Sequence, residues 1–297
     1  MKKWLVILVT LALVFAFAAC GNEPAAPPAE ETPADTETPA AEEGDHQYRA
    51  AIIFNVSDPY NGGGFERMML EGVEAVKSEL GWQVDVAEGV ELSKVYEVAA
   101  GYADEGYDAI FFPGGEFYDA WYALPEAYPD TWFLEMSLVP DYPSVGKAAA
   151  NKSDKFSYGV IVGGAMSMIS ESGTIGVVGG MPVGGVLKEF SGIIEGAEAA
   201  VPGTEVLFGW TGEYEDITNH YEVTKQLIEQ GADVLFTATG PGYKGVWQAG
   251  AEFGCKVIGY CYDSYNIDPE VITGSVAYDG PAQFLAMCRG IVDGTAH

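Results

Sequence analysis

The chain has 297 residues, of which 48% are hydrophobic and 12% aromatic, and its formal net charge is −30 at pH 7. This composition excludes a disordered chain and allows either one large domain or two ordinary ones. So strong a negative charge repels phosphate backbones, so nucleic-acid polymers are not expected as partners.

The first twenty residues have the layout of an export signal. Lys2 and Lys3 precede an apolar run, Trp4 to Ala19, which is too short for a typical membrane span, and Cys20-Gly21 follows. The small residues before Cys20 match a bacterial lipobox, although Phe17 departs from the usual aliphatic residue. We therefore predict a signal peptide over 1–20 and lipid attachment at Cys20, which places the protein on the extracytoplasmic face of the cell membrane.

Residues 21–45 should form a flexible tether, because they are rich in Pro, Ala, Glu and Thr and contain no large apolar residue. Removing Lys2 and Lys3 with the signal takes the net charge from −30 to −32. Ordinary solubility explains this acidity better than a specific acidic role.

From Arg49 the pattern alternates strands and helices. The first strand, 49–56, leads into a loop of turn-forming residues, 57–64, that contains Asp58 and Asn61. Apolar residues at helical spacing then run from Phe65 to Leu80, and Gly81 ends the helix. Further elements are expected as a strand 83–87, helix 92–104, strand 109–112, loop 113–119, a helix, and strand 131–136.

A helix over 154–170 introduces a second series of the same kind. Strands are expected at 174–180, 205–210, 234–239 and 256–263, with helices after the first two and a turn at 240–244. Gly231 stands where a left-handed helix cap is expected. Each strand ends in glycines or polar residues, and ligands bind at that edge of parallel sheets.

The chain then continues with a strand 271–278 and a helix 281–292. We expect an α/β fold of two Rossmann-like lobes with parallel sheets joined by a hinge. The first lobe is predicted to comprise 46–152 plus 264–297, and the second 153–263. Export together with a lipid anchor favours the capture of a small molecule between the lobes over an enzyme.

The sequence gives little evidence for a catalytic site or a metal site. After Cys20, the three remaining cysteines have no metal-ligand spacing, and the three histidines lie beside no nucleophile motif. We expect no enzyme activity, no metal and no cofactor. The three later cysteines are expected to be free thiols. One open alternative is an exported dinucleotide-dependent oxidoreductase, suggested by Gly179-Gly180 before a helix, although the full G-x-G-x-x-G motif is absent.

Several motifs together resemble the basic membrane protein family of lipoproteins, the purine nucleoside receptors of ABC transporters. They are Gly64-Phe65, Gly106-Tyr-Asp-Ala-Ile-Phe111, Glu116-Phe-Tyr-Asp119, Gly173 to Met181, Gly212-Glu-Tyr-Glu-Asp216, Gly231 to Phe236 and Ile258 to Asp263. The resemblance covers 49–278 and implies a type I periplasmic binding protein fold. It also implies a monomer whose partners are a small-molecule ligand and an ABC permease.

The resemblance implies a set of ligand-binding residues. Phe65 and Tyr214 match the two aromatic positions that hold a purine, and Asp119 and Asp263 match acidic positions for the ribose hydroxyls. Lys244 could add a donor at the rim, and Gly180 could let the backbone approach the ligand or serve only its turn. Asp58 and Asn61 complete the set.

Departures from the family pattern leave the ligand open. Asn55 or Asp58 stands where an acidic residue is common, Glu66 replaces an asparagine, and Cys261 replaces an aspartate. A purine nucleoside is the expected ligand. The alternatives are a sugar-like ligand, and a sensor rather than a permease as the receiving partner.

Overall fold

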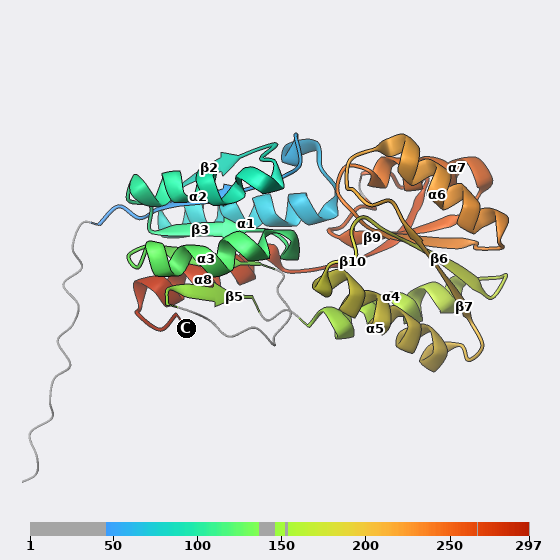
Figure 1. Cartoon of the computed structure of the whole chain (residues 1–297). Helices are drawn as coiled ribbons and strands as arrows, with labels where there is room; N and C mark the ends of the chain where they lie inside the picture. Colours follow the sequence, from blue (N-terminus) through green and yellow to red (C-terminus); the bar gives the residue numbers. More distant parts are fainter. Residues whose placement is uncertain (1–45, 137–145, 152–153, 266, 297) are drawn as a thin grey trace, which may run out of the picture. The chain divides into compact units, whose positions relative to one another are not determined.

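The chain before residue 151 supplies a five-stranded sheet in which every neighbouring pair is parallel, in the order β2-β1-β3-β4-β5 (Figure 1). This computed structural model describes residues 46–136, 146–151, 154–265 and 267–296. The strands are β1 (Arg49–Ile53), β2 (Gln83–Ala87), β3 (Ala109–Phe112), β4 (Trp132–Glu135) and β5 (Ala148–Ala150).

Helices pack on both faces of this sheet. They are α1 (Gly64–Leu80), α2 (Val95–Asp104), α3 (Tyr118–Ala127) and, from the end of the chain, α8 (Gly280–Val292). Ala50 and Ile52 of β1 share a buried cluster with α1 and α8, whereas Ile53 lies in a second cluster with α2 and α3. Successive residues of a strand point to opposite faces, so helices must cover both sides.

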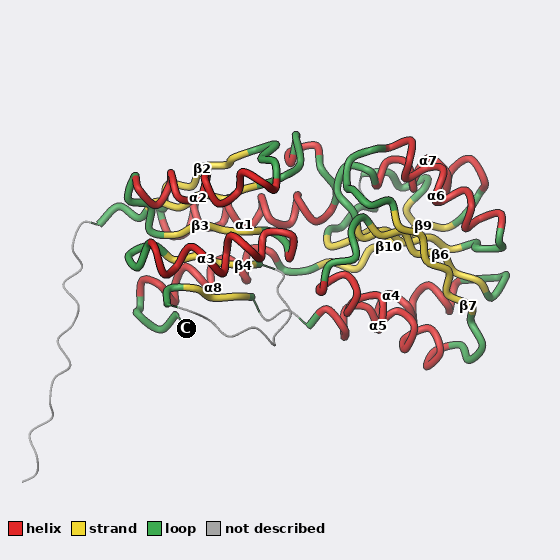
Figure 2. The backbone as a smooth tube through the Cα atoms, viewed as in Figure 1, coloured by secondary structure: helices red, strands yellow, loops and turns green. Residues whose placement is uncertain are grey.

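A second five-stranded sheet, also parallel, has the order β10-β9-β8-β6-β7 (Figure 2). Its strands are β6 (Thr174–Gly179), β7 (Glu205–Trp210), β8 (Val234–Ala238), β9 (Lys256–Cys261) and β10 (Ile272–Ala277). Its helices are α4 (Lys155–Ile169), α5 (Gly184–Ala200), α6 (Ile217–Glu229) and α7 (Tyr243–Phe253). The expected α/β fold with two parallel sheets is therefore confirmed.

Helices α4 and α5 lie backbone to backbone because glycines line both sides of their contact. A Cβ atom on Gly163 would come within 2.1 Å of the Ile193 carbonyl oxygen. One on Gly196 would come within 2.1 Å of the Val160 carbonyl oxygen. No larger residue fits there without separating the helices.

We call residues 46–150 with α8 the first lobe, and residues from α4 to β10 the second lobe. The boundary expected after Asp263 requires correction. Strand β10 pairs with β9, with Ala277 beside Cys261, so the chain leaves the second sheet only after Ala277. Helix α8 then packs on α1, where a Cβ on Gly72 would meet the Phe284 ring at 2.3 Å.

One α-helix and one strand of the described chain were absent from the sequence prediction. Helix α7 follows the expected turn at 240–244, and the three-residue strand β5 closes one edge of the first sheet. The expected helix ends are confirmed at Gly81 and Gly231, whose φ angles are +69° and +107°. Both therefore take a backbone conformation that favours glycine.

The predicted signal peptide 1–20, the lipidation site Cys20 and the tether 21–45 lie outside the described residues. In the part of the chain that the structure describes, no helix is long and apolar enough to cross a membrane.

Candidate ligand-binding site

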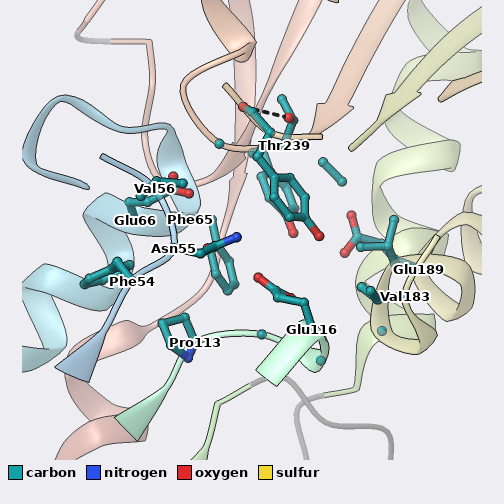
Figure 3. A pocket seen from close by; sticks show the side chains of 18 of the residues that line it. Phe54, Asn55, Val56, Phe65, Glu66, Pro113, Glu116, Val183, Glu189 and Thr239 are labelled. Atoms are coloured by element: carbon teal, nitrogen blue, oxygen red, sulfur yellow. Dashed lines mark hydrogen bonds between the residues drawn. The ribbon is translucent and has the colours of Figure 1, made fainter. Parts of the chain in front are cut away.

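A pocket lies between the two lobes, at the carboxyl ends of their strands (Figure 3). Residues after β1 and β3 line it from the first lobe, and residues at the ends of β8 and β9 line it from the second. This is the edge where open parallel sheets bind ligands. The lining residues used below are Asn55, Phe65, Glu66, Glu116, Lys155, Glu189, Tyr214, Thr239 and Tyr260.

Aromatic rings reach the pocket from both lobes. Phe65 lies in the first turn of α1, Tyr214 in the loop after β7, and Tyr260 in β9. The Phe65 and Tyr260 rings are nearly parallel, with centroids 6.3 Å apart and 13° between their planes. The pocket therefore offers flat apolar surfaces to a planar ligand.

Hydrogen bonds hold the Tyr214 loop against the end of β8. The Gly242 amide donates to the Tyr214 carbonyl oxygen at 2.8 Å, and the Thr239 hydroxyl donates to the same oxygen at 3.4 Å (Figure 3). The fully buried His220 hydrogen-bonds Thr239 Oγ1 through Nε2 at 2.7 Å. These hydrogen bonds therefore fix the position of the loop that carries Tyr214.

Gly180 makes room for the Tyr214 ring. A Cβ atom at Gly180 would lie 2.3 Å from Tyr214 Cδ1, closer than any side chain could tolerate. The residue therefore positions the aromatic ring, and it does not line the pocket.

Glu66 is a buried carboxyl group that reaches from α1 toward the second lobe. A Cβ on Gly240, in the loop after β8, would come within 2.9 Å of Glu66 Oε1. Glu66 Oε2 has no hydrogen-bond partner among the described residues. Burial raises the pKa of Glu66 to about 7, because it makes the charged form costly.

Glu116 lies just after β3, and its carboxyl group folds back over Gly114. A Cβ on Gly114 would come within 2.3 Å of Glu116 Oε2. Burial also raises the pKa of Glu116 to about 7. Glu116 and Glu66 together give the first-lobe side of the pocket two hydrogen-bond acceptors.

Glu189 of α5 faces the pocket from the second lobe, opposite Glu116 (Figure 3). The residue has no exposed surface, and burial raises its pKa to about 7, against the opposing effect of the Lys155 charge. Lys155, the first residue of α4, is itself buried, with Nζ 4.6 Å from the centroid of the Tyr278 ring. The second-lobe side therefore holds a carboxyl group and an ammonium group.

The two lobes also touch beside the pocket. Glu215, next to Tyr214, accepts hydrogen bonds from the Ser57 amide at 2.5 Å and the Ser57 hydroxyl at 2.9 Å. Gly64 at the start of α1 lies against β9, where a Cβ would overlap the Tyr260 carbonyl oxygen at 1.7 Å. These contacts join the lobes around the pocket.

Only two of the eight ligand-binding residues predicted from the sequence line the pocket, namely Phe65 and Tyr214. Asp58 caps a short turn, because its carboxylate accepts hydrogen bonds from the Asn61 amide at 3.1 Å and from the Asn61 side chain at 2.8 Å. The bond from the Asn61 side chain is the main reason why the pKa of Asp58 is lowered. Asp119 and Lys244 are exposed on α3 and α7. Gly180 stands behind Tyr214, as described above.

Asp263 lies away from this pocket. It borders a second hollow together with Glu71, Cys261, Tyr262, Ile267, Ala277 and Tyr278. Its Oδ1 accepts a hydrogen bond from the Tyr265 amide at 3.2 Å. A chain turn explains the separation, because Cys261 adopts a positive φ of 58° and directs the following residues out of the sheet.

Five residues that sequence analysis did not select shape the site. They are Glu66, Glu116, Lys155, Glu189 and His220. Glu116 stands inside a motif that carried the family resemblance, and Glu66 follows the Gly64-Phe65 motif at a position that departs from the family pattern, so the sequence did contain a signal for both.

Cys255, Cys261 and Cys288 are free thiols, as expected. Among the described residues, no cluster of three or more His, Cys, Asp or Glu side chains could hold a metal ion.

A family model described as "ABC transporter substrate-binding protein PnrA-like" matches residues 50–280. The chain belongs to the Bmp family. This family consists of binding proteins and not of enzymes, which sets aside the oxidoreductase alternative for the matched residues. It also confirms the family resemblance carried by the sequence motifs.

Two curated relatives bear names that differ in ligand. A putative ABC transporter glucose-binding protein of Haloferax volcanii is 26% identical over 163 residues, which is 54% of this chain and 41% of the relative. A purine-binding protein of Brucella abortus is 22% identical over 227 residues, which is 76% of this chain and 63% of the relative. This Bmp chain thus spans less than two thirds of the length of these relatives.

The fold has solved counterparts. An ABC transporter solute-binding protein from Aeropyrum pernix K1 superposes with a TM-score of 0.74 at 19% identity, covering 84% of this chain and 72% of the other. At that identity the likeness shows the fold alone.

Proposed function

We propose that this Bmp protein captures a purine nucleoside in the pocket between its lobes and delivers it to an ABC permease from the extracytoplasmic face of the membrane. The observation that carries the proposal is that Phe65 and Tyr214, from different lobes, line one pocket together with buried carboxyl groups. A purine has two flat apolar faces, and stacking on an aromatic ring is worth about 1–3 kcal/mol per base.

Glu66 and Glu116 supply the acceptors for the ribose. Vicinal hydroxyl groups donate two hydrogen bonds, and bonds to charged acceptors are stronger than neutral ones. Glu66 Oε2 lacks a partner among the described residues, so a ligand hydroxyl would satisfy a buried atom that is otherwise unpaired. In this geometry the two glutamates take the role that the sequence suggested for Asp119 and Asp263.

A sugar is the second candidate, because aromatic faces and carboxylates also suit a pyranose ring and one relative is named a putative glucose-binding protein. A sugar lacks a planar base, so it would use one aromatic face less well than a purine. Calorimetry with glucose beside the nucleosides separates the two ligand classes.

The test is isothermal titration calorimetry with guanosine, inosine, adenosine and glucose. At least one nucleoside should bind in the micromolar range or tighter, and Phe65→Ala and Tyr214→Ala should each weaken it by about 1–3 kcal/mol. Tyr122→Ala is the control, since Tyr122 is a 48% exposed aromatic residue on α3 outside the pocket. Binding of glucose with no response to any nucleoside would overturn the purine proposal and leave the binding-protein fold intact.

A further inference from the structure

Glu189 is the one residue of α5 that brings two unpartnered acceptor atoms to the pocket. Both of its carboxyl oxygens are buried and have no hydrogen-bond partner in the described part of the chain. The side chain cannot leave easily, because the Glu189 backbone is pressed against α4, where a Cβ on Gly159 would come within 2.0 Å of the Glu189 carbonyl oxygen. An unpaired buried carboxyl group is costly unless a ligand pairs with it.

Lys155 adds a donor at the same end of the pocket. Its ammonium nitrogen lies 5.7 Å from the centroid of the Phe65 ring and 4.6 Å from that of Tyr278, and it is 6% exposed. Its positive charge acts on Glu189. A ligand at this end therefore meets two adjacent acceptors and one cationic donor.

That set of groups complements one edge of one purine class. A 6-oxo-2-aminopurine presents N1–H and the 2-amino group side by side, which matches the paired oxygens of a carboxylate, and its O6 is an acceptor for an ammonium group. A 6-oxopurine without the 2-amino group offers one of these two donors. A 6-aminopurine offers an acceptor at N1, which a carboxylate repels.

We propose that Glu189 pairs with the N1–H and 2-amino groups of a guanine-type base, with Lys155 facing O6, and so makes the protein selective for 2-amino-6-oxopurine nucleosides. This selectivity rests on the proposed function, since it assumes a purine in the pocket. Phe65 and Tyr214 stack on the faces of any purine, whereas Glu189 distinguishes one purine from another by the polar groups on its edge.

Calorimetry of the wild-type protein with guanosine, inosine and adenosine provides the first test. Guanosine should bind at least about tenfold more tightly than inosine, because one hydrogen bond to a charged group is lost, and adenosine should bind more weakly still. N1-methylguanosine should also lose at least about tenfold, since the methyl group removes the N1–H donor. These comparisons need no variant protein.

Glu189→Gln provides the second test. Its amide offers one donor and one acceptor, so guanosine should weaken by at least about tenfold while adenosine, whose N1 accepts and whose amino group donates, should bind more tightly. Glu195→Gln is the control, because Glu195 lies on the same helix and is exposed, and it should leave the order unchanged.

The outcomes separate this inference from the function on which it rests. If no nucleoside binds to the wild-type protein, the proposed function fails. If guanosine, inosine, adenosine and N1-methylguanosine bind equally, the purine site stands and the selectivity of Glu189 is refuted. If Glu189→Gln weakens every nucleoside by the same factor, the residue only supports the structure together with Lys155, and the proposed pairing is likewise refuted.

Discussion

Burial makes Glu189 bind a proton more tightly than an ordinary glutamate does. Burial raises its pKa from the ordinary value of 4.5 to about 7. The phenols of Tyr158, Tyr260 and Tyr278 and the thiol of Cys261, which surround it, have raised pKa values too and stay neutral below pH 8. Lys155 is therefore the group around Glu189 that acts as an opposing charge near neutrality.

This burial predicts a pH dependence of stability. The folded state binds the Glu189 proton more tightly than the unfolded state does, so the contribution is fully present below about pH 4.5 and is lost as pH rises to about 7. Urea denaturation of the ligand-free protein should show that the free energy of unfolding falls between pH 5 and pH 8. The fall should be smaller in Glu189→Gln than in the wild type.

Glu66 and Glu116 also make the free energy of unfolding fall as pH rises, since burial raises their pKa values as well. The Glu189→Gln variant should therefore retain part of the pH dependence. Glu195→Gln controls for the loss of one negative charge and should keep the wild-type slope. Equal slopes in Glu189→Gln and the wild type would show that Glu189 is hydrated and ionised in the folded protein.

The close packing of helices α4 and α5 fixes the positions of Lys155 and Glu189. Gly163→Ala should destabilise the protein by roughly 1–3 kcal/mol, because its Cβ would lie 2.1 Å from the Ile193 carbonyl oxygen and the helices would have to separate. Measurement of the free energy of unfolding in urea checks this.

Gly164→Ala is the matched control on the same helix. Its Cβ would meet its nearest neighbours at 3.6 and 3.8 Å, which is ordinary contact, and alanine favours a helix by about 1 kcal/mol over glycine. Equal stabilities of the two variants would mean that the helices are farther apart than described.

The sequence predicted most elements but not every connection. Strong β-branched runs and helical periodicity identified the strands and helices of both sheets. Gly240-Pro-Gly242 predicted a turn, so the helix α7 that follows was not predicted. Gly245 of α7 must be small, because the helix contacts the Ile217 carbonyl oxygen there. The lobe to which β10 belongs depends on pairing with β9, and no local pattern encodes that pairing.

The site was also predictable only in part, because some of its residues are brought there by contacts that no local pattern encodes. Tyr214 stood out because it lies between two glutamates after a strand, outside any apolar period. Lys155 and Glu189 begin or occupy helices, where charged residues usually face water. The sequence shows that α4 is apolar on most sides, but it does not show that the helix turns its first residue inward, because burial there arises from tertiary packing.

For the whole molecule, the sequence makes a prediction about attachment that concerns residues outside the described part. The Ala-Ala-Cys-Gly junction at Cys20 should carry a lipid, so Cys20→Ala should move the protein from the membrane fraction to the soluble fraction. Fractionation and immunoblotting check this. Full-length Cys20→Ala protein that still sediments with membranes would show that Cys20 is not the anchor.

The path of the chain has a consequence for the order in which the protein can fold. The second lobe is one continuous segment, whereas the first lobe is completed by α8, whose Phe284 is fully buried against α1 and whose Arg289 pairs with Glu79 at 3.0 Å (Figure 1). Contacts between segments this far apart in sequence form slowly, because a long loop must close first. The face of α1 that packs on α8 is therefore covered only once the part of the chain after the second lobe is available.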